Sequence, residues 1–264
     1  MLPERPCGAD VGRIAEVVVV NGEPMVRGGI IAAGAGSRLR QAGWPMPKPM
    51  VPVAGVPLIA HVIDNFITAG ITSLVIIVNE QERDCANWVR ARFPDIDLRF
   101  IVKTTRSSLE SFLAVGRRLG SGRVLISAVD TWCPAAEFVR FVRAARQYPP
   151  EAVVLGVTPL VADECPLWVA LDASGRLTSL GGETGEMVTA GVYIVPERVR
   201  SLSPPRGLGR LREFLAWLVK RGHPVYGVIM ERVVDVDRAE DVALAEALAH
   251  HGIRESEEPL GGVR

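Results

Sequence analysis

Several residues near the start of the chain have the types and spacing needed to hold a phosphorylated molecule. Gly34, Gly36 and Ser37 follow a short apolar run that is typical of a buried strand, and Arg38 and Lys48 add two positive charges. Glycines after a strand allow a sharp turn that brings backbone N–H groups against an anion. Arg can bind a phosphate through two hydrogen bonds, whereas Lys acts as a compact charge. This stretch therefore predicts a loop that binds the phosphates of a triphosphate.

The stretch differs from two widespread phosphate-binding loops. It has neither the closing Gly-Lys-Ser/Thr of a P-loop nor the Gly-x-Gly-x-x-Gly of a dinucleotide-binding loop. Lysine is rare in this chain, which has only Lys48, Lys103 and Lys220 and otherwise uses Arg. Lys48, between two prolines, is therefore the more notable as a functional candidate.

The elements that must position these residues alternate between strand and helix in the first half of the chain. Apolar runs predict strands at residues 30–33, 73–78, 98–102 and 123–129, and helical periodicity predicts helices at 57–67, 80–93 and 107–116. Such alternation predicts an α/β fold with an open, mostly parallel Rossmann-like sheet and right-handed crossovers. Ligands of these sheets bind at the carboxyl ends of the strands. Gly34, Ser107 and Asp130 all fall at such ends.

The second half of the chain has short apolar runs separated by turn residues. This pattern predicts antiparallel strands that extend the sheet. These strands are expected at residues 152–157, 168–171, 177–180 and 188–195, with turns at 172–175 and 181–182. A further amphipathic helix is expected around 211–218, a last strand ending at 233–237 and a closing helix at 239–250. No linker divides the chain. We therefore expect an extension at residues 1–27, which could include a small hairpin around Asn21-Gly22, one domain at 28–252 and a frayed tail at 253–264.

Composition narrows the classes of partner. The 264 residues carry 30 basic and 30 acidic side chains, so the formal net charge is zero and no basic patch indicates a nucleic acid. No apolar run is long enough to span a bilayer. The four cysteines lie far apart and are expected to be reduced. These features predict a cytoplasmic protein that binds neither nucleic acid nor membrane, with assembly into a homo-oligomer left open.

Two motifs carry a resemblance to a known family. The run Ala-Ala-Gly-x-Gly-Ser-Arg-Leu at residues 32–39 is followed at 47–58 by Pro-Lys-Pro-Met-x-Pro-Val-x-Gly-x-Pro-Leu. Together they resemble the nucleotidyltransferases that make sugar nucleotides, whose relatives include cytidylyltransferases for inositol phosphate or phosphocholine and the molybdenum-cofactor guanylyltransferase. The resemblance covers residues 28–250 approximately and implies the nucleotide-diphospho-sugar transferase type of fold.

The resemblance implies the reaction and the residues that carry it. A phosphate oxygen of a phosphorylated small molecule, such as a sugar, polyol or amino-alcohol phosphate, would attack the α-phosphorus of a nucleoside triphosphate and release pyrophosphate. Positioning and cationic stabilisation would carry the catalysis. Lys48 would contact the α-phosphate and the incoming phosphate, and Arg38 the β- and γ-phosphates. The implied nucleotide-binding residues are Ala32, Ala33, Gly34, Ala35, Gly36, Ser37, Arg38, Lys48, Ser107 and Ser108.

The resemblance also implies a Mg²⁺ site and an acceptor side. Asp130 matches the first metal aspartate of the family, and Asp237 matches the second better than Asp235 does. Asp237 and Glu240 could instead form a capping pair for the last helix. Thr189 and Gly191 match the acceptor side of the site, and Ser107 and Ser108 could be helix-capping residues rather than nucleotide ligands.

One departure leaves the acceptor open. Many sugar nucleotidyltransferases hold the sugar phosphate with a second lysine, but no Lys lies between 104 and 219 in this chain. That contact is absent or passes to an arginine such as Arg176. Two alternatives remain: a molybdenum-cofactor-type guanylyltransferase, and a non-catalytic nucleotide-sensing subunit with the same fold. The identity of the base also stays open.

Overall fold

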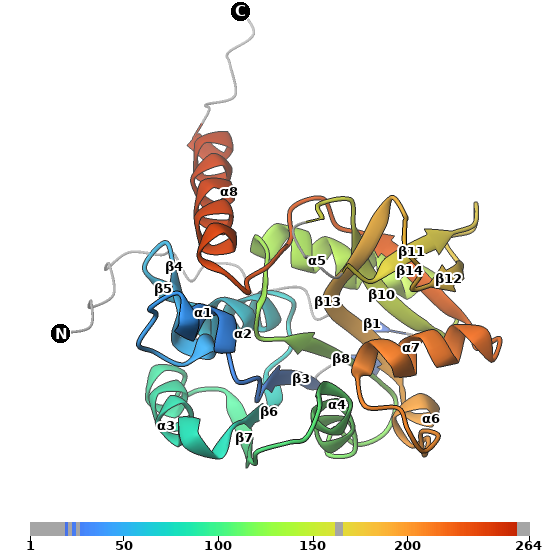
Figure 1. Cartoon of the computed structure of the whole chain (residues 1–264), viewed down its shortest axis with the longest axis horizontal. Coiled ribbons are helices and arrows are strands. Elements are labelled where there is room, and N and C mark those ends of the chain that lie inside the picture. The colour runs from blue at the N-terminus through green and yellow to red at the C-terminus, as the bar shows by residue number, and fades with distance from the viewer. Residues whose placement is uncertain (1–18, 21–22, 25–26, 162–165, 258–264) are drawn as a thin grey trace, which may run out of the picture.

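The computed structural model describes residues 19–20, 23–24, 27–161 and 166–257 (Figure 1). Its centre is a mixed sheet to which nine described strands belong. Four neighbouring strands of this sheet come from the first half of the chain and are parallel. Their spatial order is β8 (Arg123–Ala128), β3 (Arg27–Ala32), β6 (Ser73–Val78) and β7 (Asp97–Val102). Most residues of β3, β6 and β8 are buried, as expected for parallel strands with helices on both faces.

The second half of the chain extends this sheet beyond β8. The long strand β13 (Met187–Pro196) runs antiparallel to β8 and is where the sheet forks. One branch holds the antiparallel strands β11 (Trp168–Leu171) and β12 (Leu177–Leu180). The other holds β10 (Val153–Thr158), antiparallel to β13, and β14 (Val225–Ile229), parallel to β10.

Helices cover both faces of the sheet and bury two apolar cores. One core lies under α2 (Leu58–Thr68), α3 (Arg83–Arg92) and α5 (Ala135–Ala144). The other lies under α4 (Ser108–Gly116), α6 (Glu197–Arg200) and α7 (Leu211–Lys220). Single turns of 3₁₀ helix are found at Lys48–Met50, Glu80–Glu82 and Ala145–Gln147.

A third, smaller cluster joins the start of the chain to its end. The short helix α1 (Ser37–Gln41) and the hairpin of β4 (Pro52–Val53) and β5 (Val56–Pro57) pack here against α8 (Ala239–Glu257). In Figure 1, α8 rises from this cluster and points away from the sheet. This packing matters for function because it brings the segment before α8 against the segment after β3.

The predicted fold class is confirmed: an α/β protein with a mostly parallel first half and antiparallel strands in the second. Four strands were missed, namely β14 of the large sheet and the short strands β4, β5 and β9 (Thr131–Trp132), and one was misplaced. The segment 233–237 does not end a strand of the large sheet. Its two residues in β15 (Val234–Asp235) instead pair antiparallel with β9, just after β8.

The ends of the described chain partly match the expectations. The short strands β1 (Val19–Val20) and β2 (Glu23–Pro24) pair antiparallel, as a hairpin requires, although its turn lies outside the described residues. The closing helix continues to Glu257, so residues 253–257 are helical rather than frayed. The free thiols of Cys85 and Cys133 are buried, while Cys7 and Cys165 lie outside the described residues. None of the described helices is long and apolar enough to cross a bilayer.

Candidate active site

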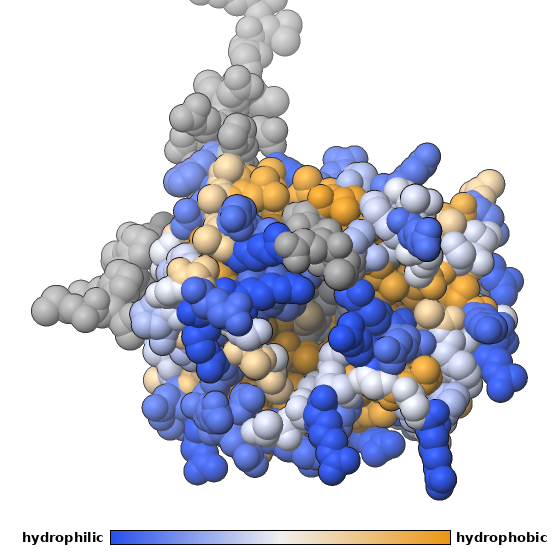
Figure 2. Space-filling model, viewed as in Figure 1, coloured by the Kyte–Doolittle hydropathy of each residue, from blue (hydrophilic) through white to orange (hydrophobic). Residues whose placement is uncertain are grey.

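A cavity of about 690 Å³ opens at the carboxyl ends of β3 and β8. Its size lies within the range typical of small-molecule sites. The hollow lies between α1 and α7, near the centre of the face shown in Figure 2, and hydrophilic surface flanks it. The wall includes residues 33–38, Lys48, residues 104–108, Asp130 and the start of α7. The predicted position at the strand ends therefore coincides with a real cavity.

The glycine loop after β3 forms one wall, and one glycine in it has a clear structural reason. Gly36 has φ +57°, and a Cβ there would lie 2.8 Å from the Cβ of Lys48. A side chain at position 36 would push Lys48 out of place as well as strain the backbone. Two residues of α1 anchor the loop. Leu39 is buried, and the Arg40 guanidinium donates to the Ala35 carbonyl at 2.7 Å.

Lys48 is buried at the floor of the cavity, only 6 % exposed, at the start of a 3₁₀ turn. Its Nζ donates to Asp130 Oδ2 at 2.6 Å and also to Asp237 Oδ1. Burial lowers the pKa of Lys48, but the carboxylates of Asp130, Asp235 and Asp237 outweigh burial and raise that pKa above its usual value. Lys48 is therefore a permanent positive charge at neutral pH.

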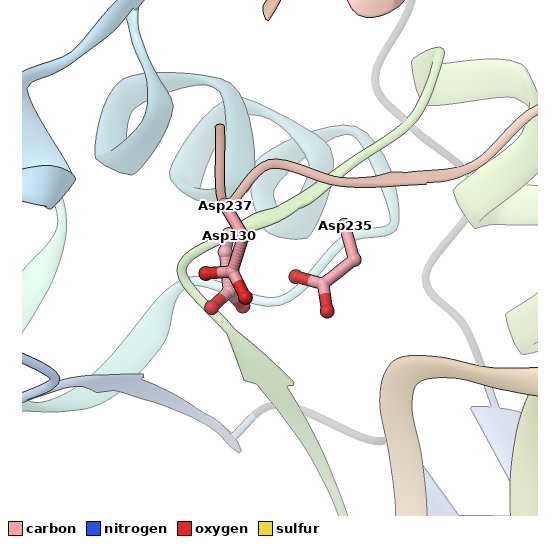
Figure 3. Close-up of side chains that lie close together, drawn as sticks. All are labelled: Asp130, Asp235 and Asp237. Carbon is pink, nitrogen blue, oxygen red and sulfur yellow. The ribbon is translucent and has the colours of Figure 1, made fainter. Parts of the chain in front are cut away.

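Three aspartates lie close together in the cavity wall (Figure 3). Asp130, Asp235 and Asp237 each offer a carboxylate oxygen, and these oxygens lie within 4.8 Å of one another. The route that brings them together differs from the prediction. They are not the ends of parallel strands of one sheet: β15 pairs directly with β9, and the Val236 N–H donates to the Asp130 carbonyl at 3.0 Å. The short antiparallel ladder places the segment before α8 across the end of β8.

The side chain of Asp237 points into the cavity rather than to its helix. Arg38 donates to Asp237 Oδ2 at 2.6 Å, and Lys48 contacts the other oxygen. The carboxylate that caps α8 belongs to Asp241, which accepts hydrogen bonds from the N–H groups of Asp237 and Arg238 at 2.9 and 2.8 Å. The alternative of a capping pair between Asp237 and Glu240 is therefore wrong. Burial raises the pKa of Asp237, but Lys48 and Arg38 outweigh it and hold that pKa below its usual value.

The two serines line the wall on the far side of the glycine loop, and both have structural partners. The Ser107 hydroxyl caps α4 by accepting from the Glu110 N–H at 3.2 Å. The Ser108 hydroxyl accepts from the Leu211 N–H at 3.0 Å and so ties the start of α4 to the start of α7. Their role as nucleotide ligands stays a prediction. This wall also includes polar residues that the sequence did not single out: Asn79, Thr104, Thr105 and Arg106.

The third wall is formed by β13 and the start of α7. Thr189 and Gly191 line it, together with Tyr193 and several apolar side chains, namely Leu160, Leu167, Val188, Leu211 and Leu215. Contact of Thr189 and Gly191 with an acceptor stays a prediction. Gly191 has φ +73°, and a Cβ there would lie 2.1 Å from the hydroxyl oxygen of Thr131. Gly191 therefore lets β13 pass close to β9 directly behind Asp130.

A substitution tests this close approach. We expect Gly191→Ala to lower the free energy of unfolding by about 2–4 kcal/mol, because it adds left-handed strain to a collision with Thr131. The matched control is Gly122→Ala, where φ is +82° but nothing lies within 4 Å of the added Cβ, and about 1 kcal/mol is expected. Urea denaturation of both variants measures the difference; equal losses would show that the Thr131 contact costs nothing.

The structure brings the predicted site residues together with two exceptions. Ala32 is fully buried within β3 and is not part of the cavity wall. Arg176, suggested as a substitute for the missing lysine, donates to the Gly222 carbonyl at 3.3 Å from the turn after β11 and does not line the cavity. Arg212 lines it instead. No local signal marks Arg212, because an arginine on an amphipathic helix is usually a solvated residue.

The cavity, with its glycine loop, Lys48 and three aspartates, is now placed in the fold, and comparison with known proteins gives the family. Residues 28–225 match the family model of the MobA-like NTP transferase domain, so the chain belongs to that family. Its relatives include a CMP-5'-(3-aminopropyl)phosphonate synthase of Streptomyces rubellomurinus, 25 % identical, and a glucose-1-phosphate thymidylyltransferase of Actinoplanes sp., 28 % identical. The alignments cover 77 % and 75 % of this chain, but 33 % and 68 % of the two relatives.

Solved structures agree on the fold. The inositol-1-phosphate CTP transferase from T. maritima superposes with a TM-score of 0.74 at 20 % identity, over 85 % of this chain and 96 % of its own. The predicted resemblance to sugar-nucleotide-forming nucleotidyltransferases is thereby confirmed.

Proposed function

We propose that this protein is a Mg²⁺-dependent nucleotidyltransferase. It transfers a nucleoside monophosphate from a nucleoside triphosphate to the phosphate or phosphonate oxygen of a small molecule and releases pyrophosphate. The acceptor classes suggested by the relatives' names are sugar phosphates, polyol phosphates and aminoalkyl phosphonates. The observation that carries the proposal is the buried Lys48, held by Asp130 and Asp237 at the floor of a cavity whose wall is the glycine loop.

The donor set fits magnesium. Mg²⁺ prefers one or two carboxylates together with waters and phosphate oxygens, and Asp130, Asp235 and Asp237 supply such carboxylates on one side of an open cavity. We assign Asp130 and Asp237 as the ligands. The bound ion would neutralise charge that develops on the phosphates. Lys48 and Arg38 contact these same carboxylates, so both cations lie beside the place where the ion and the phosphates would bind.

The chain's own residues then supply position and charge. The N–H groups of the glycine loop and the Arg38 guanidinium hold the β- and γ-phosphates, and Lys48 stabilises the α-phosphate during attack. The acceptor oxygen is already an anion, so no side chain has to act as a base. A bond forms between that oxygen and the α-phosphorus while the bond to the β-phosphate oxygen breaks, and the electron pair leaves with pyrophosphate.

A screen for pyrophosphate release tests the proposal. Each of the four common ribonucleoside triphosphates and dTTP is incubated with Mg²⁺ and with glucose 1-phosphate, inositol 1-phosphate or 3-aminopropylphosphonate. At least one pair is expected to release pyrophosphate, and the triphosphate alone is not. Release without an acceptor would instead indicate a hydrolase. The molybdenum-cofactor alternative predicts turnover only with a pterin phosphate, and the non-catalytic alternative predicts binding without release.

Because triphosphates are cytoplasmic metabolites, we propose the cytoplasm as the compartment.

We also expect the nucleotide to order the glycine loop. Gly34, Ala35, Ser37 and Arg38 are exposed, and Leu39 is the buried anchor among them. Loops with so few buried contacts open readily, and a ligand that binds only the closed form slows that opening. Amide hydrogen exchange at residues 34–38 should slow about tenfold when triphosphate and Mg²⁺ are added, while the exposed turn at 173–175 should not change. Slowing at that turn alone would place the nucleotide elsewhere.

A further inference from the structure

An acceptor with a phosphate or phosphonate group needs a basic side chain to bind it, in addition to those that bind the triphosphate. Four basic side chains of the described residues line it: Arg38, Lys48, Arg106 and Arg212. Arg38 and Lys48 contact Asp237 and Asp130 on the glycine-loop side. Two arginines therefore stand on the other walls, in a chain that has no lysine between 104 and 219.

Arg106 lies on the serine wall. It directly precedes Ser107, and its backbone N–H donates to the Glu110 carboxylate at 2.8 Å. Its side chain is exposed, and it lines the cavity together with Thr104 and Thr105. Arg106 is therefore an exposed arginine of the cavity wall, and its backbone is tied to Glu110.

Arg212 occupies a different position, in the first turn of α7 on the wall shared with β13. The bond from the Leu211 N–H to the Ser108 hydroxyl fixes the start of α7, and Arg212 itself is half-buried. Arg212 lines the same cavity as Tyr193, Asp130 and Asp235. Burial, Asp130 and Asp235 raise the pKa of the Tyr193 phenol, and Arg212 opposes them. Arg212 and the aspartates thus lie close enough to act on one buried group.

We propose that Arg212 binds the phosphate or phosphonate group of the acceptor and holds its oxygen toward the α-phosphorus. The inference rests on the proposed function and assigns to α7 the contact that a lysine makes in many relatives. An acceptor anion that approaches three carboxylates and a triphosphate needs a compensating charge. A guanidinium can bind two oxygens of one phosphate, which fixes orientation as well as charge. Arg212 forms no covalent bond with the acceptor, so the bonds made and broken are those of the proposed transfer.

The kinetic test compares Arg212→Gln with Arg176→Gln, a control on an arginine outside the cavity. For the best donor–acceptor pair of the pyrophosphate screen, Arg212→Gln should raise the acceptor KM about 10- to 100-fold and leave the triphosphate KM within about threefold. The acceptor KM of Arg212→Lys should lie between those of Arg212→Gln and the wild type. Lysine keeps the positive charge but cannot bind two phosphate oxygens as a guanidinium does. Arg176→Gln should match the wild type. A raised triphosphate KM with an unchanged acceptor KM would overturn the inference and assign Arg212 to the nucleotide.

A binding measurement tests the role of Arg212 separately from the proposed function. If no pair in the screen reacts, the proposed function is contradicted, and phosphate binding still shows whether Arg212 holds an anion. Binding of inorganic phosphate to the nucleotide-free protein is followed by broadening of its ³¹P signal. We expect affinity at least about tenfold weaker in Arg212→Gln than in the wild type or Arg176→Gln. Phosphate binding that is lost in Lys48→Ala but unchanged in Arg212→Gln would overturn the inference.

Discussion

The Lys48→Ala variant should turn over about 10²–10³-fold more slowly than the wild type while it still folds, because it lacks one preorganised charge at the α-phosphate. Lys48 is buried at the floor of the cavity and contacts two of the three aspartates there. The prolines on either side and the close approach of Gly36 fix the backbone of Lys48, and neither Lys103 nor Lys220 lines the cavity. The loss should appear mainly in kcat, since stabilisation of a developing charge acts in the transition state.

The control for this variant is Lys103→Ala. Lys103 is half-exposed, pairs with Glu110 at 2.6 Å and lies outside the cavity, so its removal should leave kcat within about twofold. Circular dichroism and thermal unfolding establish that both variants fold. Near-normal turnover in a folded Lys48→Ala protein would contradict the role assigned to Lys48.

The pH dependence of Lys48 follows from the direction of its pKa. A lysine whose folded pKa is raised stabilises the fold fully below its unfolded pKa of about 10.4, and this stability is lost as pH rises through the folded pKa. Between pH 7 and 9, Lys48 should therefore keep its charge. A fall in turnover within that window would have to come from another group.

The second large effect is expected at the aspartates. Asp130→Asn and Asp237→Asn should each raise the Mg²⁺ concentration needed for half-maximal turnover by about tenfold or more, because each removes one charged ligand. Neither change should greatly lower thermal stability without nucleotide, since Asp241 caps α8. If both residues share one ion, the double variant should lose little beyond the worse single variant, because effects within one site are not additive.

Asp235→Asn is the matched comparison. Asp235 belongs to the same cluster but comes from the paired residues of β15, whereas Asp237 follows them and contacts Arg38 and Lys48. We expect a smaller shift in Mg²⁺ dependence for Asp235→Asn than for Asp237→Asn. The reverse order would transfer the ligand role to Asp235, and unshifted values in all variants would contradict a metal site in this cluster.

The parts of the fold that the sequence predicts well are those with a local cause. Continuous apolar runs such as residues 73–78 identify buried strands because a parallel strand has neighbours on both faces. The strand β14 was missed because Gly227 interrupts its pattern. A Cβ at Gly227 would lie 2.9 Å from a methyl group of Leu171, so this glycine is required by a neighbour that is remote in sequence.

The same distinction applies to the site. The glycine loop and Lys48 carry a contiguous motif, and the structure places that motif on one cavity wall. The alternation of valine and aspartate at 233–237 predicts a strand end, but pairing with β9 rather than with the sheet determines where Asp235 and Asp237 lie. The place of Arg212 in the cavity wall could not be predicted from the sequence, because it depends on the tertiary contact between α7 and α4.

The central claim is that this cavity transfers a nucleotide by attack at the α-phosphorus, and the fate of labelled phosphates tests it most directly. With a donor–acceptor pair from the screen, a γ-³²P-labelled triphosphate should yield labelled pyrophosphate, and an α-³²P-labelled one should label the acceptor product. Both products should depend on Lys48. Label from the γ-position that appears instead in inorganic phosphate or on the acceptor would show attack at the γ-phosphorus and would contradict the account.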